Sequence, residues 1–188
     1  HKAIRRQRQM CIRDSIVSLA SRLPQNLTTL TVTGTVTAVP DMAFAQLAKL
    51  SEVYLFTGED AVNVTSYGAF SFYNTAVSGD WTFTNVTAIG ESAFEGTRLM
   101  SVSLPGTLAG NMGTSAFASI ADLAGITLGE GITRIAPNAF AAYSSAGETG
   151  DDGYTYDVRR SKVDHELVIP STAVSYTHLR AHETSAHL

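Results

Sequence analysis

The chain has 188 residues and a formal net charge of −4, from 13 lysines and arginines against 17 aspartates and glutamates. An acidic balance argues against a nucleic-acid-binding protein, which requires a basic surface. Apart from Cys11 the chain has no cysteine, and no stretch approaches the roughly 18 consecutive apolar residues of a membrane span.

The N-terminal residues do not follow the pattern of the rest of the chain. Residues 5–15 read RRQRQMCIRDS, which resembles a translated sequencing adapter. The basic run would otherwise suggest contact with nucleic acid or a membrane, and Cys11 would suggest a redox thiol. An adapter origin accounts for both features, so we interpret residues 1–15 as a tail outside the fold.

An Ala-Phe dipeptide recurs five times beyond this tail, at steps of 26, 24, 23 and 23 residues. The five phenylalanines are Phe44, Phe70, Phe94, Phe117 and Phe140. A period in this range is typical of a repeat solenoid, in which each unit contacts only its neighbours. We expect five units and an N-terminal partial unit within residues 16–173, with these phenylalanines stacked and buried.

Other apolar positions keep a constant distance from these phenylalanines. Eight residues before them stand Val36, Val62, Val86, Ala109 and Ile132, and five before stand Val39, Thr65, Ile89, Met112 and Ile135. Three residues after them, in three units, stand Leu47, Ile120 and Tyr143. These positions are predicted to line the interior of the solenoid.

Each unit also contains a short segment with apolar residues at alternate positions, which predicts a β-strand. The inward pairs are Leu30/Val32, Val53/Leu55, Trp81/Phe83, Val102/Leu104, Ile126/Leu128 and Leu167/Ile169. The residue between the members of each pair is expected to face outward. This outward row comprises Thr31, Tyr54, Thr82, Ser103, Thr127 and Val168.

The segments AIGESAFEGTRLMSVSLPGTL and RIAPNAFAAY resemble the BspA-like leucine-rich repeats of bacterial surface proteins. The resemblance covers about residues 19–170. It implies a leucine-rich-repeat-like parallel β-sheet with short helical or irregular convex segments. The family's cysteine position is filled here by Leu47, Tyr73, Ile120 and Tyr143, and the unit at Phe94 is one residue short of the family pattern.

The last unit contains an insertion at about residues 144–166, rich in Gly, Ser and Asp at its start, which predicts a loop. Its aspartates Asp151, Asp152 and Asp157 could bind calcium or form a solvated acidic loop, and their spacing departs from the EF-hand pattern. A second group could form a recognition patch, since tyrosine and arginine are enriched at binding hot spots. Alternatively, the segment is a β-hairpin extension that packs its tyrosines on the solenoid. The group consists of Tyr154, Tyr156, Arg159 and Arg160.

The C-terminal residues 174–184 read VSYTHLRAHET and resemble the opposite strand of an adapter, so we interpret residues 174–188 as a second tail. Its histidines, His178, His182 and His187, would otherwise suggest a metal site. Two adapter tails indicate a metagenomic fragment of a longer protein. Without the tails, 7 basic and 15 acidic residues remain, a balance of −8 (7 − 15).

No catalytic constellation stands out, since His165 is the sole histidine between the tails. We therefore expect a non-enzymatic, adhesion-type protein-binding module of a larger bacterial cell-surface protein, extracellular and without cofactor or metal. By the resemblance, its partners would be host proteins, matrix proteins or other cells. The alternative is a structural spacer that displays another domain. The candidate contact residues are Tyr54, Thr82, Ser103 and Thr127, with Tyr154, Tyr156, Arg159 and Arg160 of the insertion.

Overall fold

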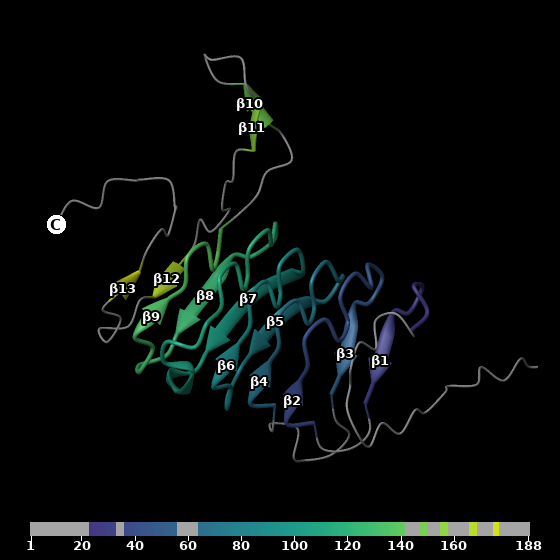
Figure 1. The fold of residues 1–188 in the computed structure, drawn as a ribbon, viewed down its shortest axis with the longest axis horizontal. Helices are drawn as coiled ribbons and strands as arrows, with labels where there is room; N and C mark the ends of the chain where they lie inside the picture. The colour runs from purple at the N-terminus through teal and green to yellow at the C-terminus, as the bar shows by residue number, and fades with distance from the viewer. Residues whose placement is uncertain are drawn as a thin grey trace, which may run out of the picture.

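The computed structural model describes residues 23–32, 36–55, 64–141, 147–149, 155–157, 166–168 and 175–176. Within them the chain winds into a parallel β-solenoid (Figure 1). The described helical content is a single short 3₁₀ helix, η1 (Gly106–Leu108). The predicted class, a leucine-rich-repeat-like solenoid, is therefore confirmed.

The longer strands form one side of the coil and pair only in parallel. In chain order they are β1 (Thr29–Thr31), β3 (Glu52–Tyr54), β5 (Ser78–Thr82), β7 (Arg98–Leu104), β8 (Gly125–Leu128) and β12 (Glu166–Val168). They form two sheets, β1-β3 and β12-β8-β7-β5. The predicted inward residues are in register, with Leu30 opposite Val53, Trp81 opposite Val102, and both Val102 and Leu167 opposite Ile126.

A second series of parallel strands runs along another side of the coil. It comprises β2 (Ala38–Val39), β4 (Ser66–Tyr67), β6 (Ala88–Ile89), β9 (Arg134–Ile135) and β13 (Ser175–Tyr176). The first three form one sheet, a bridge between Ile89 and Met112 extends it, and β13 pairs with β9. The backbone of β13 thus continues the repeat into residues 174–188, whose adapter origin stays a prediction.

Five stacked phenylalanines form the centre of the core, and one of them is not the one that the Ala-Phe pattern predicts. The series runs through Phe44, Phe72, Phe94, Phe117 and Phe140, with successive ring centroids 5.0, 5.2, 5.3 and 5.5 Å apart; the first pair of rings is tilted by 42° and the other three pairs are nearly parallel. The assignment of Phe70 was wrong: it is only half-buried and packs against Tyr73, with ring centroids 5.6 Å apart. We call the five stacked residues the anchor phenylalanines.

The backbone of the turns explains why Phe72 and not Phe70 enters the stack. The residue two positions before each anchor phenylalanine adopts a left-handed conformation, as Met42 (φ 55°), Ser92 (φ 50°) and Phe70 (φ 56°) do. The N–H of each of the first four anchors then donates to the carbonyl before the next anchor, for example Phe44 N to Ser71 O at 2.8 Å and Phe72 N to Ala93 O at 2.7 Å. Because this ladder joins successive turns, it fixes which residue points inward.

The shift of two residues corrects the neighbouring positions as well. Val64 and Tyr67 are buried at the places where Val62 and Thr65 were predicted. Thr65 is exposed, and Val62 lies outside the described residues. Counted from Phe72, the inward residue Trp81 lies nine residues on, as Val53 does from Phe44.

The position three residues after each anchor is also corrected in two units. Thr75, three residues after Phe72, is buried at the position that was predicted for Tyr73. Thr97, three residues after Phe94, is buried in the unit that was predicted to be one residue short. Their hydroxyls donate to the anchor carbonyls, Thr75 to Phe72 at 2.9 Å and Thr97 to Phe94 at 2.8 Å. These hydrogen bonds offset the cost of burying a hydroxyl, so threonine can replace an apolar residue here.

Most predicted inward strand residues are buried, including Leu55, Val102, Leu104, Ile126 and Leu128. Leu30, Val53 and Trp81 are exceptions among the described residues, since all three are only partly buried. They lie on β1, β3 and β5.

Candidate binding surface

The outward row of the longer strands forms an aligned, exposed surface. In register, Thr31 lies opposite Tyr54, Thr82 opposite Ser103, and Ser103 opposite Thr127. Tyr54 is 53% exposed, Thr82 and Thr127 are exposed, and Ser103 is half-buried. The structure thus brings the four predicted contact residues of the solenoid onto one face, which we call the strand face.

The strand face carries a second row that the sequence reasoning missed. Glu52 and Asp80 stand two residues before Tyr54 and Thr82, and both are exposed. The hydroxyl of Thr29 donates to Glu52 Oε2 at 3.3 Å, and that of Ser101 donates to Asp80 Oδ1 at 2.6 Å. The alternation that predicts the first row also predicts this one, because residues i and i+2 of a strand share a face.

The strand face is interrupted between β3 and β5. No strand pairing joins these two strands in the described part of the chain, although β4, which follows β3, pairs with both β2 and β6. The second series of strands and the hydrogen-bond ladder at the anchors therefore hold the two turns together, while within the described residues the edges of β3 and β5 that face each other have no strand partner. In Figure 1, β3 and β5 lie next to each other in the row of longer strands.

A cavity of about 340 Å³ lies at this interruption, and we call it the β3–β5 slot. Val53 and Leu55 line it from β3 and the residue after it. The other lining residues are Val64, Tyr67 and Val86 near the second series, and Asp80, Trp81, Thr82, Phe83 and Thr84 from β5 and beyond. Both inward and outward residues of β5 take part, so the slot runs from the strand face toward the core.

Three aromatic rings meet at the slot. The ring of Phe83 lies 5.5 Å from that of Tyr67 in an edge-on contact and 5.8 Å from that of Trp81. Burial raises the pKa of the Tyr67 phenol well above its ordinary value, because the interior disfavours the charged phenolate. Tyr67 therefore stays neutral, and Asp80 is the ionisable residue that gives the slot its charge.

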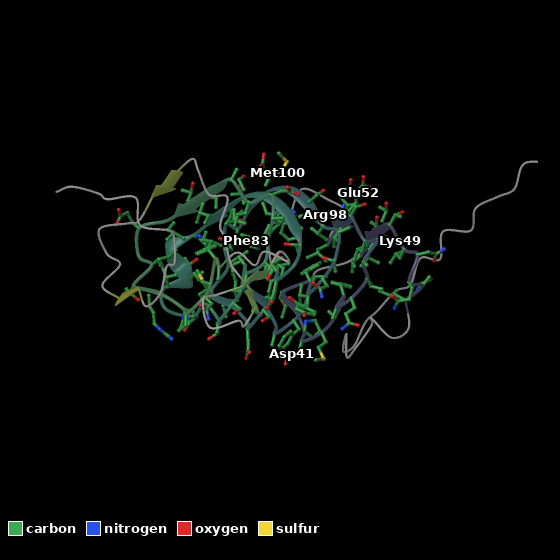
Figure 2. The ribbon with its side chains drawn as sticks, turned by 90° about the horizontal axis from the view of Figure 1, so that it is seen from above. Asp41, Lys49, Glu52, Phe83, Arg98 and Met100 are labelled. Carbon is green, nitrogen blue, oxygen red and sulfur yellow. The ribbon has the colours of Figure 1, made fainter. Side chains whose placement is uncertain are left out.

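Figure 2 shows where this surface lies on the coil. Phe83 is seen in the interior, while Glu52 and Met100 lie along one long side and Asp41 lies on the opposite side. Met100 is 57% exposed and stands where the pairing of β5 with β7 shifts register. The strand face is thus a single side of the solenoid.

The predicted insertion contains a β-hairpin. Strand β10 (Gly147–Thr149) pairs antiparallel with β11 (Thr155–Asp157), and Glu148 lies opposite Tyr156. The hairpin stands out from the solenoid in Figure 1. Tyr154, Arg159 and Arg160 of the predicted patch, and Asp151 and Asp152 of the calcium hypothesis, lie outside the described residues. The recognition role of this segment stays a prediction.

Two further searches bear on the function. Within the described residues no group of three or more His, Cys, Asp or Glu side chains could hold a metal ion. In the same part of the chain no helix is long and apolar enough to cross a membrane. The histidines of the C-terminal tail lie outside the described residues.

The comparison with protein families identifies the repeat. Residues 21–146 match the BspA-type leucine-rich repeat region in six copies, so the chain belongs to the BspA-type leucine-rich repeat family. Repeats of this type are modules of bacterial surface proteins. No curated protein and no solved structure matches the chain.

Proposed function

We propose that the chain is a non-enzymatic protein-binding module of adhesion type, part of a larger bacterial cell-surface protein that acts outside the cell. The observation that supports this most is the strand face, an aligned and exposed surface with Tyr54 at 53% exposure. Tyrosine is enriched at binding hot spots because it buries a large area and carries a hydrogen-bonding tip. The proposed partners are proteins of the host, the matrix or other cells.

The proposed mechanism is recognition through many weak contacts spread over successive turns. Successive turns present similar side chains, so the strand face provides contact area for the partner. Specificity for the partner comes from the irregular parts of the surface. The hairpin segment with Tyr154, Tyr156, Arg159 and Arg160 is one such part. The β3–β5 slot is another.

The test is adhesion of the full 188-residue chain, coupled to beads, to host cells and to isolated matrix. The double variant Tyr54→Ala/Thr82→Ala should bind at least tenfold more weakly. The control is Thr114→Ala/Thr133→Ala, which also removes two exposed side chains but away from the longer strands. Replacement of residues 146–164 by a short Gly-Ser linker tests the hairpin segment in the same assay, with at least a tenfold loss expected.

Equal binding by the strand-face variant and its control would remove the strand face from the mechanism. Absence of binding by the unmodified chain to every cell and matrix sample would contradict the adhesion function. That second outcome would favour a structural spacer that displays a separate domain.

A further inference from the structure

We propose that the β3–β5 slot binds a cationic side chain, lysine or arginine, presented by an extended segment of a basic protein partner. The proposal rests on the proposed protein-binding function and specifies the chemistry of the partner. Its basis is a cavity of about 340 Å³ with aromatic walls and a carboxylate, placed where the strand face is interrupted.

The size and lining of the slot can accommodate a side chain. Ligand pockets in proteins begin at about 300 Å³ and combine apolar walls with a few polar groups. Val53 and Leu55 offer an apolar wall for the methylene stem of a lysine or arginine. Trp81, which also lines the slot, is only partly buried.

The charge of the slot selects a cation. Cations are attracted to the faces of tryptophan and tyrosine rings, and more strongly where water is excluded. Asp80 is the charged residue among those that line the slot, and none of them is basic. An anionic side chain would meet repulsion from Asp80, whereas a guanidinium or ammonium group would gain an ionic contact.

A second carboxylate strengthens this preference. Glu52 and Asp80 occupy equivalent positions of adjacent turns, each one residue before the inward residue Val53 or Trp81. Each carboxylate already accepts a hydrogen bond from a hydroxyl on the neighbouring strand away from the slot: Glu52 accepts from Thr29, and Asp80 accepts from Ser101. Glu52 thus adds a second negative charge to the face that carries Asp80.

The strand edges explain why the partner segment should be extended. The edge of β5 away from β7 and the edge of β3 away from β1 have no strand partner in the described residues. An extended peptide that crosses this interruption of the strand face can place alternate side chains in pockets. One such side chain would enter the slot between Thr82 and Tyr67.

Trp81 makes the proposal directly measurable, because it is the only tryptophan of the chain. The probes are acetylated Gly/Ser heptapeptides that differ only in the central residue: arginine, lysine, norleucine or glutamate. Titrated into the full chain, the arginine and lysine peptides should shift Trp81 emission with at least tenfold tighter binding than the other two. Their affinity should fall as salt is added, because the attraction is electrostatic.

Variants of exposed slot residues sharpen the test. Asp80→Asn keeps an acceptor for Ser101 but removes the charge, and it should weaken the cationic peptides at least fivefold. Asp122→Asn, an exposed acid outside the slot, is the matched control and should change affinity less than twofold. At Thr84, which is exposed on the slot, Thr84→Glu should strengthen and Thr84→Lys should weaken binding. Unchanged denaturation midpoints verify that each variant is folded.

Several results would overturn the proposal. The first is an equal affinity for the arginine and glutamate peptides, and the second is an unchanged affinity for the cationic peptides in Asp80→Asn. The third is a shift of Trp81 emission with neutral oligosaccharides but not with the cationic peptides. The adhesion assay separates this from the wider function. If the chain adheres but the cationic peptides do not shift Trp81 emission, the cation site alone is refuted. If the unmodified chain does not adhere to any sample, the protein-binding function is refuted.

Discussion

Single residues in the turns decide how well successive coils pack. Ser71 occupies the position that Ala43, Ala93 and Ala116 hold in other turns, and all four are fully buried. The hydroxyl of Ser71 is buried and has no hydrogen-bond partner. A buried hydroxyl without a partner costs about 1–3 kcal/mol, so this turn is less stable than its neighbours at that position.

Replacing this serine should stabilise the protein. Ser71→Ala is expected to raise the free energy of unfolding by about 1 kcal/mol, because it removes an unsatisfied group and restores the residue of the other turns. Urea denaturation followed by circular dichroism measures the change. The matched control is Thr75→Val, which should lower the free energy by about 1 kcal/mol because it removes the hydrogen bond to Phe72 O. A loss of stability in Ser71→Ala would show that its hydroxyl has a partner.

The two neighbouring phenylalanines should differ sharply in energetic weight. Phe72→Ala is expected to cost about 3–5 kcal/mol, since its ring is fully buried between Phe44 and Phe94. Phe70→Ala should cost about 1 kcal/mol or less, because it loses mainly one half-buried aromatic contact with Tyr73. Denaturation midpoints of the two variants give the comparison. The reverse order would restore Phe70 as the anchor.

At the scale of elements, close backbone approach limits the second series of strands. Gly68, Gly90 and Gly113 stand one residue after the strand or bridge residues Tyr67, Ile89 and Met112. Their N–H groups donate to the preceding turn, Gly90 to Tyr67 O and Gly113 to Ile89 O, each at 2.7 Å. A Cβ on Gly90 would overlap the backbone of Gly68 and Ala69. Glycine is therefore required for the turns to stack here.

This requirement leads to a prediction for the strand element. Gly90→Ala should destabilise the protein by about 2 kcal/mol, because the backbone of the neighbouring turn must shift to admit a methyl group. Gly110→Ala is the matched control, since a Cβ there would meet Thr133 and Arg134 only at 3.5 and 3.6 Å, ordinary contact distances. Thermal unfolding of both variants provides the test. An equal effect of the two substitutions would contradict the close approach.

At the scale of the whole molecule, each turn is supported only by the turns beside it. Phe117 stacks between Phe94 and Phe140, and no ring contact joins it to Phe44. Damage in a solenoid should therefore spread to neighbours and weaken with distance. The interruption between β3 and β5 should limit this spread further, because one side of the coil has no strand pairing there within the described residues.

Hydrogen exchange can follow this spread. Phe117→Ala should cost about 3–5 kcal/mol and should increase amide exchange most in the turns of Phe94, Phe117 and Phe140. The turn of Phe44 should change least. Uniform loss of protection along the chain would show that the solenoid unfolds as one cooperative unit, contrary to the expectation of nearest-neighbour coupling.

The sequence by itself determined the class of fold and the strand face. The repeat period and the alternation of residues such as Val102 and Leu104 are properties of short segments, and they hold wherever the segments are placed. The same alternation placed Tyr54, Thr82, Ser103 and Thr127 on one face, and the structure agrees.

Only the tertiary structure decided between Phe70 and Phe72 and left β3 apart from β5. Both phenylalanines lie in the segment AFSF, where local propensity does not distinguish them. The choice depends on the register of the ladder with the next turn, in which Phe70 N donates to Glu91 O and Phe72 N donates to Ala93 O, so that Phe72 is aligned with Phe94. The β3–β5 slot likewise depends on which strands pair across turns. Contacts between distant segments are set by packing of the whole coil, and a single repeat does not encode them.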